Sequence, residues 1–396
     1  MGRVSVKKLF LFIPILFVFL YCGPKQEEVE RIMEDGVEVV INHIEPYKIT
    51  AEPTELKLEE IFRIDMEKEE IAELGLADAY TFDVDSAGNI FLFQYPREGE
   101  HLVFKFNKAG NFLMSFGDVG QGPEEIQLPG YLRMTSDDEI PIIDRTAKEL
   151  MFFDTHGVFL REIRFDLIYR PFRGFELLEN GNFLIHWLSL GPSGEIQKFT
   201  ISIFSSGFNK IKDLIDYDFP GLEDEKISVF GELPVVGTSK KKIFLGYEKI
   251  GKDILVYDLN GRLEKKIRKK YRPIAVPDEL KQEIEEMKTE LKGHPLWDQI
   301  YIPSYMPLFQ YFFTDDEERL YVLTSEKDKN LGTNICDIYN PEGVFIGRKS
   351  MGYFDLLKFI YLTQPLDIIA KGGRLYCLRE KESGYKELVV YKMNWE

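Results

Sequence analysis

Short runs of alternating apolar and polar residues recur along this chain, and residues 79–129 hold the clearest set. Four runs at 81–85, 90–95, 102–107 and 112–116 are separated by turns rich in Ser, Asn and Gly. Strands this short, punctuated by Gly and Asn, indicate an antiparallel meander rather than alternating strands and helices. Four antiparallel strands per repeat are typical of one blade of a β-propeller.

The turn between the third and fourth runs returns four more times. FNKAGNF at 106–112 is followed by FDTHGVF, FSSGFNKI, YDLNGRL and YNPEGVF, and the turn glycines are Gly110, Gly157, Gly207, Gly261 and Gly343. Asn or Asp caps such a turn, and Gly supplies the positive φ that closes a hairpin. The spacings of 47, 50 and 54 residues suit propeller blades, and the last spacing of 82 residues predicts an insertion.

The number of blades follows from the end of the chain. A sixth unit begins near Leu366 and supplies three strands before the sequence ends at Glu396. An open outer edge would promote aggregation, so the run LKLEEIFRID at 56–65 is predicted to pair there as the fourth strand. We therefore predict an all-β, six-bladed propeller of four-stranded antiparallel blades over residues 51–396, closed by an N-terminal strand.

The N-terminus is typical of an exported protein. Arg3, Lys7 and Lys8 precede an apolar run at 9–20, which predicts a signal peptide over 1–21. Cys22 follows directly and resembles the lipid-modified cysteine of a bacterial lipobox, although Tyr21 replaces the usual small residue. Residues 22–50 are then a lipid-anchored tether and N-terminal extension, in the periplasm or at the cell surface. The alternative is a secreted protein cleaved near Gly23.

Charge narrows the range of partners. The formal net charge is −17, and loss of the three basic residues of the signal takes it to −20. Such an acidic chain argues against nucleic acid and against wide contact with anionic lipid. We expect a monomer attached to the membrane by its acyl chains. Cys336 and Cys377 remain, and a bridge between them is not expected.

The insertion, residues 272–305, contains the one predicted helix, at 277–292. Its acidic residues come early and its lysines late, and Leu280, Ile284, Met287 and Leu291 form a single apolar stripe. The insertion joins the outer strand of blade four to the inner strand of blade five. That connection lies on the face where propellers generally bind ligands, as do residues 117–130 and 351–364. The basic run EKKIRKKY at 264–271 is interpreted as protection of an outermost strand, with a patch for a partner as the alternative.

Three segments carry a resemblance to a known family. VDSAGNIFL at 84–92, FNKAGNFLMSFG at 106–117 and GQGPEEIQLP at 120–129 resemble six-bladed β-propeller lipoproteins of bacteria related to NHL-repeat proteins. Glu124 stands where that family usually has Gly, and Ile126 where it has Phe. The resemblance covers residue 36 to the C-terminus and implies the fold and export. It says little about activity, because propellers host many functions.

No local motif for catalysis or metal binding is present. The acidic turn at 83–88 lacks an oxygen ligand at Ala87 and a Glu at Gln94, so it is interpreted as a hairpin turn rather than a calcium loop. The five histidines include no close pair, which argues against zinc. We predict no metal site and no cofactor, and calcium is the one ion left open.

Candidate binding residues are those expected on the ligand face. The loop after blade one supplies Gln121, Glu124 and Glu125, and the remaining connections supply His294, Trp297, Tyr301, Tyr305 and Tyr353. The simpler interpretation is a loop over the channel mouth together with aromatic core residues. The predicted function is an exported lipoprotein that binds a partner protein, glycan or small ligand at the channel mouth. The alternative is a metal-dependent hydrolase or lyase of the lactonase type, whose ligands would come from several blades.

Overall fold

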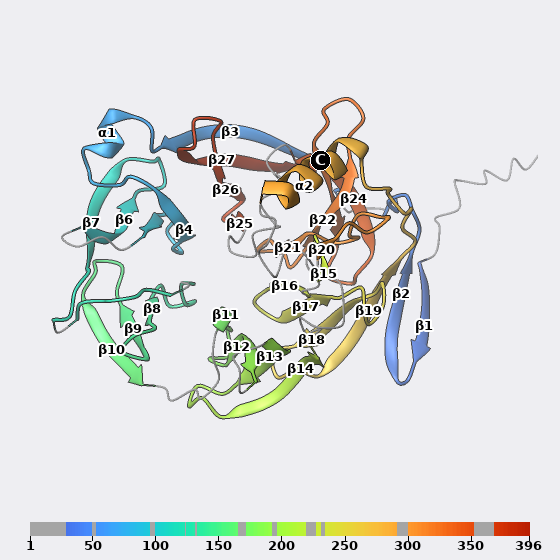
Figure 1. Ribbon diagram of the computed structural model, residues 1–396, viewed down its shortest axis with the longest axis horizontal. Coiled ribbons are helices and arrows are strands. Elements are labelled where there is room, and N and C mark those ends of the chain that lie inside the picture. Colours follow the sequence, from blue (N-terminus) through green and yellow to red (C-terminus); the bar gives the residue numbers. More distant parts are fainter. Residues whose placement is uncertain are drawn as a thin grey trace, which may run out of the picture.

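The chain forms a ring of six β-sheets around a central axis (Figure 1). The computed structural model describes residues 29–49, 53–95, 100–122, 124–130, 133–164, 172–191, 196–218, 227–230, 234–290, 300–351 and 368–396. Within these ranges no helix is long and apolar enough to cross a bilayer. The predicted all-β, six-bladed propeller is therefore confirmed.

Four of the blades are built from consecutive antiparallel strands, except that blade four carries two further strands. Blade one consists of β4 (Ala79–Val84), β5 (Ile90–Gln94), β6 (His101–Phe106) and β7 (Phe112–Asp118). Blade three consists of β11 (Phe172–Leu177), β12 (Phe183–Leu190), β13 (Ile196–Phe204) and β14 (Lys210–Asp218). Blade four contains β16 (Val235–Thr238), β17 (Lys242–Gly246), β18 (Ile254–Asp258) and β19 (Leu263–Lys269). Blade five consists of β21 (Tyr311–Thr314), β22 (Leu320–Lys327), β23 (Asn334–Tyr339) and β24 (Phe345–Met351).

Blade two has three strands in the described residues: β8 (Ile140–Asp144), β9 (Glu149–Phe153) and β10 (Phe159–Arg164). Its innermost position is held by residues 128–130. The backbone N–H of Gly130 donates to the carbonyl of Ile143 at 2.7 Å, and Pro129 bridges to Asp144. The inner edge of β8 is thus paired, as in the other blades.

The ring closes through an N-terminal strand, as the sequence predicts. Blade six consists of β25 (Ile368–Lys371), β26 (Arg374–Glu380) and β27 (Lys386–Trp395), and β3 (Leu56–Asp65) pairs antiparallel with β27 (Figure 1). Leu56 and Ile64 on β3 are buried. An early strand therefore completes the last blade.

The basic run at 264–271 does not lie on an outermost strand, so that interpretation is wrong. The hairpin of β1 (Glu30–Glu34) and β2 (Val37–Asn42) extends the sheet, and β2 pairs in parallel with β19 (Figure 1). Arg268 forms two hydrogen bonds with Glu34 on β1, at 2.7 and 2.8 Å. The basic side chains therefore bind an acidic hairpin of the same chain. β1 also begins inside the stretch interpreted as a tether.

The segment after β2 continues around the outside of blade five. The amide of Asn42 donates to the carbonyl of Gly343 at 3.0 Å and accepts from the N–H of Phe345 at 2.8 Å. The N–H of Tyr47 donates to the carbonyl of Phe345 at 2.8 Å. We call residues 30–65 the N-terminal belt, because they contact the outer strands of blades four, five and six in turn.

The repeated turns adopt the predicted left-handed conformation with one shift. Gly110, Gly157, Gly261 and Gly343 have φ between 79° and 83°. In the third copy the positive φ of 58° belongs to Phe208 instead of Gly207. The hydrogen bond from the N–H of Phe208 to the carbonyl of Ser205 shows that the turn lies one residue later than predicted.

The core lies between neighbouring blades. Six clusters of buried side chains each join two consecutive sheets, and the cluster between blades five and six includes Cys336 and Cys377. Both cysteines are free thiols, and burial raises the pKa of the Cys377 thiol to about 12. Between blades four and five, the buried Lys269 pairs with the buried Asp337, which also accepts from Arg348 at 2.9 Å.

Candidate functional site

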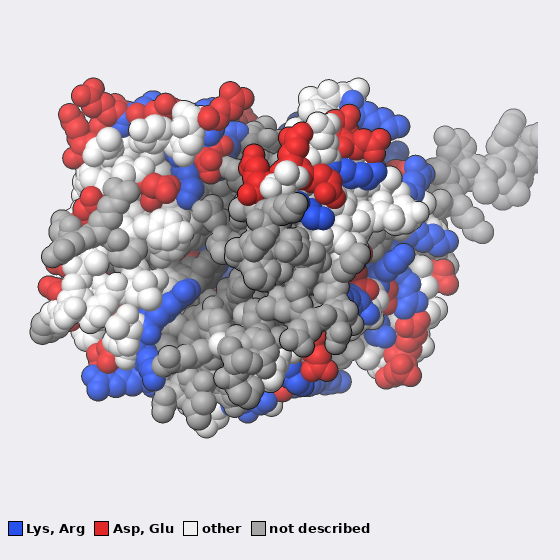
Figure 2. Space-filling view, in the orientation of Figure 1, with Lys and Arg blue, Asp and Glu red and all other residues white. Residues whose placement is uncertain are grey.

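One face of the ring carries all the connections from an outer strand to the next inner strand. We call it the mouth face. It includes α1 (Glu69–Ala72) and α2 (Asp278–Glu290), and both lie on the side turned to the viewer in Figure 1. The predicted helix at 277–292 is confirmed over Asp278–Glu290, and residues 291 and 292 lie outside the described residues. Acidic side chains gather over α2 and around α1 in Figure 2, which views the same face.

The helix α2 packs onto this face by its apolar stripe. Ile284 is fully buried together with Val229, and Leu280 packs against the same pair. Two short parallel strands, β15 (Ile227–Ser228) and β20 (Ile300–Tyr301), hold the insertion against the connection between blades three and four. The insertion is therefore a lid element of the ring rather than a free arm.

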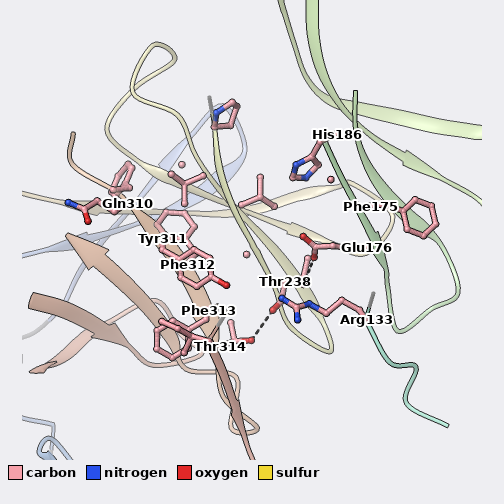
Figure 3. Close-up of a pocket in the computed structure, with 18 of the residues that line it drawn as sticks. Arg133, Phe175, Glu176, His186, Thr238, Gln310, Tyr311, Phe312, Phe313 and Thr314 are labelled. Atoms are coloured by element: carbon pink, nitrogen blue, oxygen red, sulfur yellow. Dashed lines mark hydrogen bonds between the residues drawn. The ribbon is translucent and has the colours of Figure 1, made fainter. Parts of the chain in front are cut away.

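A cavity of about 1330 Å³ runs along the axis beneath these connections. Its lining comes from the innermost segments of all six blades and from mouth-face connections (Figure 3). This volume exceeds the usual range for a small-molecule pocket, about 300–1,000 Å³. The central channel can therefore hold a ligand larger than a single small molecule.

A chain of hydrogen bonds crosses three inner strands inside the cavity. The hydroxyl of Thr314 on β21 donates to the carbonyl of Thr238 on β16 at 2.9 Å, and the hydroxyl of Thr238 donates to Glu176 Oε2 on β11 at 2.8 Å (Figure 3). These bonds fix the position of the Glu176 carboxylate. Arg133, from the inner segment of blade two, extends toward the same point in Figure 3.

His186 is a polar residue in the cavity wall, and one of its buried atoms is not satisfied by its surroundings. It lies on β12 directly opposite Gly174, and its Nε2 is buried without a hydrogen-bond partner. A Cβ at position 174 would lie 2.9 Å from His186 Nδ1, so only Gly leaves room for the ring there. Glu176 is two residues further along β11 and therefore shares the face with His186.

Burial lowers the pKa of His186 below its usual value, and the negative charge of Glu176 opposes this by raising it. The imidazole is therefore neutral at neutral pH. A neutral imidazole offers one nitrogen as donor and the other as acceptor. A buried polar atom without a partner destabilises a fold unless a water or another molecule binds to it.

Aromatic side chains surround the mouth of the cavity. Tyr80 and Tyr95 of blade one have ring centroids 4.9 Å apart, and the Tyr80 hydroxyl donates to the carbonyl of Gly130 at 3.2 Å. Tyr95 remains 51% exposed. Tyr301 and Tyr305 of the insertion also line the cavity and are exposed. Tyrosine side chains thus lie at the entrance, and the wall combines apolar side chains such as Phe312 with polar ones such as Glu176.

The structure brings together some of the residues predicted from the sequence. Tyr301 and Tyr305 line the cavity, whereas Gln121, Glu124 and Glu125 are outside its lining. Glu125 folds back on its own loop, where its Oε2 accepts from the N–H of Gly122 at 2.6 Å, and Glu124 has a φ of 66°. Cys22, His294, Trp297 and Tyr353 lie outside the described residues, as do the signal peptide and lipobox.

Sequence reasoning missed Glu176, His186, Thr238 and Thr314. Glu176 and His186 lie inside ordinary strands, and Thr238 and Thr314 are the last residues of β16 and β21, so none of the four belongs to a motif. The usable signal was Gly174, since a Gly inside a strand often marks a close approach by another group.

The acidic turn at 83–88 is a hairpin, as predicted. Asp85 accepts from the N–H of Asn89 at 2.7 Å, and Gly88 has a φ of 85°. Among the described residues, no group of three or more His, Cys, Asp or Glu side chains is placed to hold a metal ion.

Comparisons with known proteins concern the fold. A model of the DUF5128 family, described as a 6-bladed beta-propeller, matches residues 84–223. No curated protein matches the chain significantly.

Solved structures are also similar to this chain in fold. A member of the DUF4221 family from Bacteroides vulgatus is 10% identical, with a TM-score of 0.50, and the match covers 87% of this chain and 100% of that chain. A candidate exported protein from Bacteroides fragilis is 13% identical, with a TM-score of 0.45, over 90% and 99% of the two chains. A gluconolactonase from Xanthomonas campestris is 9% identical, with a TM-score of 0.42, over 89% and 99%. At these identities the likeness concerns the fold alone.

Proposed function

We propose that this chain is an exported, lipid-anchored binding protein that holds a glycan, or a similarly polyhydroxylated ligand, in its central cavity. The observation that carries this proposal is the buried, unpartnered Nε2 of His186 in the wall of a cavity of about 1330 Å³. A ligand hydroxyl would satisfy this nitrogen.

The chemistry of the wall suits sugar hydroxyls. Glu176 accepts hydrogen bonds, and its carboxylate is already held in place by Thr238 at 2.8 Å. His186 is neutral, so the cations of the cavity lining are Arg and Lys side chains such as Arg133 and Arg145. The apolar C–H faces of sugar rings pack on aromatic faces such as those of Tyr95, Tyr301 and Tyr305, while their hydroxyls reach polar groups deeper in the cavity.

The lactonase-type alternative would need carboxylates free to bind an ion at the channel. Two acids along the cavity already have protein partners: Asp83 accepts from the N–H of Met134 at 2.7 Å, and Asp315 pairs with Arg319 at 2.9 Å. No observation on the described residues favours this alternative over binding.

The test is a screen of the mature chain, residues 22–396 with Cys22 replaced by Ser, against an array of plant and bacterial oligosaccharides. We expect retention of at least one glycan class, followed by measurement of its affinity by calorimetry. His186→Ala and Glu176→Gln should each weaken that affinity by about tenfold, since each removes a hydrogen bond from a desolvated polar pair.

His156→Ala is the matched control, because His156 lies on a hairpin of the opposite face and is 75% exposed. Its affinity should equal that of the parent chain. Failure to retain any oligosaccharide, or equal loss in all three variants, would contradict the proposal.

A further inference from the structure

Exposed apolar side chains mark the tips of the mouth-face hairpins. In five blades the connection between the second and third strands, or the strand end beside it, carries one: Tyr95, Leu190, Ile250, Leu331 and Tyr385. Their exposed fractions range from 45% for Leu190 to 68% for Leu331. Because the five come from different blades, they form a ring around the cavity entrance.

The opposite face also exposes large apolar side chains on its hairpins: Met33 beside the β1–β2 turn, Phe112 at the start of β7, and Val158. Exposed apolar residues on hairpins are ordinary on a soluble protein, so the point where the N-terminal chain enters the fold has to distinguish the two faces.

The N-terminal chain enters the fold on the mouth face. β19 ends there, at the start of the insertion, and β2 runs parallel to it with Asn42 beside Lys269. β1 is antiparallel to β2, and its first residue, Glu30, pairs with Ile41. The chain that precedes Glu30 therefore leaves the ring at the edge of the mouth face, beside blade four.

The distance from there to the proposed anchor is short. Val29 lies seven positions after Cys22, and a fully extended chain over seven positions spans at most about 25 Å. If the opposite face lay on the membrane, the tether would have to run from the mouth face down the side of the ring to reach the bilayer. A five-residue strand alone spans about 17 Å, so this path would use most of the tether. Placing the mouth face toward the membrane leaves the tether slack.

We propose that the edge of the mouth face formed by blades four to six lies against the bilayer that holds the lipid anchor, with Ile250, Leu331 and Tyr385 at the headgroup level. This inference rests on the lipid-anchored part of the proposed function. The tether keeps the tips at high local concentration beside the bilayer, so weak contacts suffice. Tyr and aliphatic side chains favour this interfacial layer. The acidic α2 on the same face disfavours strongly anionic lipid and favours a zwitterionic surface.

The orientation can be measured with the anchor supplied artificially. A hexahistidine tag replaces Cys22 of the mature chain, which is then held on phosphatidylcholine vesicles containing a nickel-chelating lipid. Cys336 and Cys377 are buried, so a cysteine introduced by Asn330→Cys at the mouth face or by His156→Cys at the opposite face takes a fluorophore selectively. Brominated phosphatidylcholine then quenches a fluorophore that lies at the bilayer surface.

We expect quenching at position 330 to exceed that at 156 by about twofold or more, as for a group in the headgroup layer. In the Asn330→Cys background, the triple substitution Ile250→Ser, Leu331→Ser and Tyr385→Ser should remove most of this quenching. The matched triple Leu113→Ser, Val158→Ser and Ile211→Ser changes exposed apolar residues elsewhere and should leave it unchanged.

Equal quenching at the two positions, stronger quenching at 156, or no effect of the first triple would overturn the inference. The nickel tether makes these outcomes independent of lipidation in the cell. Lipidation is followed separately by uptake of labelled fatty acid, which Cys22→Ser should abolish, and glycan binding is measured in solution.

Discussion

The polar residues inside the channel are held by neighbours from other blades, so each depends on the ring for its position. Thr238 holds Glu176 by a hydrogen bond, and Thr314 holds Thr238 in the same way. The position of the Glu176 carboxylate therefore depends on the packing of blades three, four and five. His186 has no such partner for its Nε2. Its protonation is therefore governed by burial and by the charge of Glu176.

The buried His186 makes the stability of the folded state depend on pH. Because burial lowers the pKa of His186 in the folded state, the unfolded chain binds a proton that the folded chain does not, as pH falls below the usual value of about 6.5. The folded state thus loses stability over that range. Replacing His186 with Asn removes the loss, so the melting temperature of His186→Asn should rise relative to wild type between pH 7.5 and pH 5. A difference between His186→Asn and wild type that stays constant over this pH range would contradict the burial argument.

At the scale of the element, the insertion is the largest departure from the repeat. Ile284 of α2 and Val229 are buried together, and the neck of the insertion is closed by a bridge between Ala275 and Tyr305. α2 therefore covers a mouth-face connection without taking part in any blade.

Excision of 277–292, bridged by a short Gly/Ser loop, should leave the six blades folded. Closure of a longer or shorter loop changes stability slowly, by about 0.6 kcal/mol per doubling of length. Circular dichroism should show an intact β spectrum, whereas affinity for the retained oligosaccharide should fall sharply because Tyr301 and Tyr305 lose their support. Unchanged affinity with unchanged folding would mean that the ligand does not contact the insertion.

Elements that repeat were predictable, and elements that pair at a distance were only partly so. The turns at Gly110, Gly157, Gly261 and Gly343 share a pattern, because closing each hairpin needs a positive φ. The third copy of the turn lies one residue later than its sequence predicts, because Phe208 adopts the positive φ in place of Gly207. The pairing of β3 with β27 was predictable because one strand was missing from the count. The pairing of β2 with β19 was not, because a short apolar run does not specify which edge it covers.

For the whole molecule, closure by β3 decides whether the ring is complete. β3 buries Leu56 and Ile64 and pairs with β27 along its length. A chain that begins at Glu67 should therefore aggregate or melt about 10 °C lower or more, since it loses several kcal/mol of apolar burial. A chain that begins at Val29 retains the N-terminal belt and should melt normally. Differential scanning calorimetry distinguishes the two, and normal melting of the shorter chain would refute closure by β3.

The N-terminal belt also sets an order of events during synthesis. β3 emerges early, yet its partner Trp395 is the second residue from the end of the chain, more than 300 residues later. Contacts so distant in sequence form slowly. For the whole of that interval the unpaired strand at 56–65 waits while the five intervening blades are produced. The synthesis of β27 thus determines when β3 acquires its neighbour, and a chain truncated before β27 would leave the edges of β3 and β26 exposed.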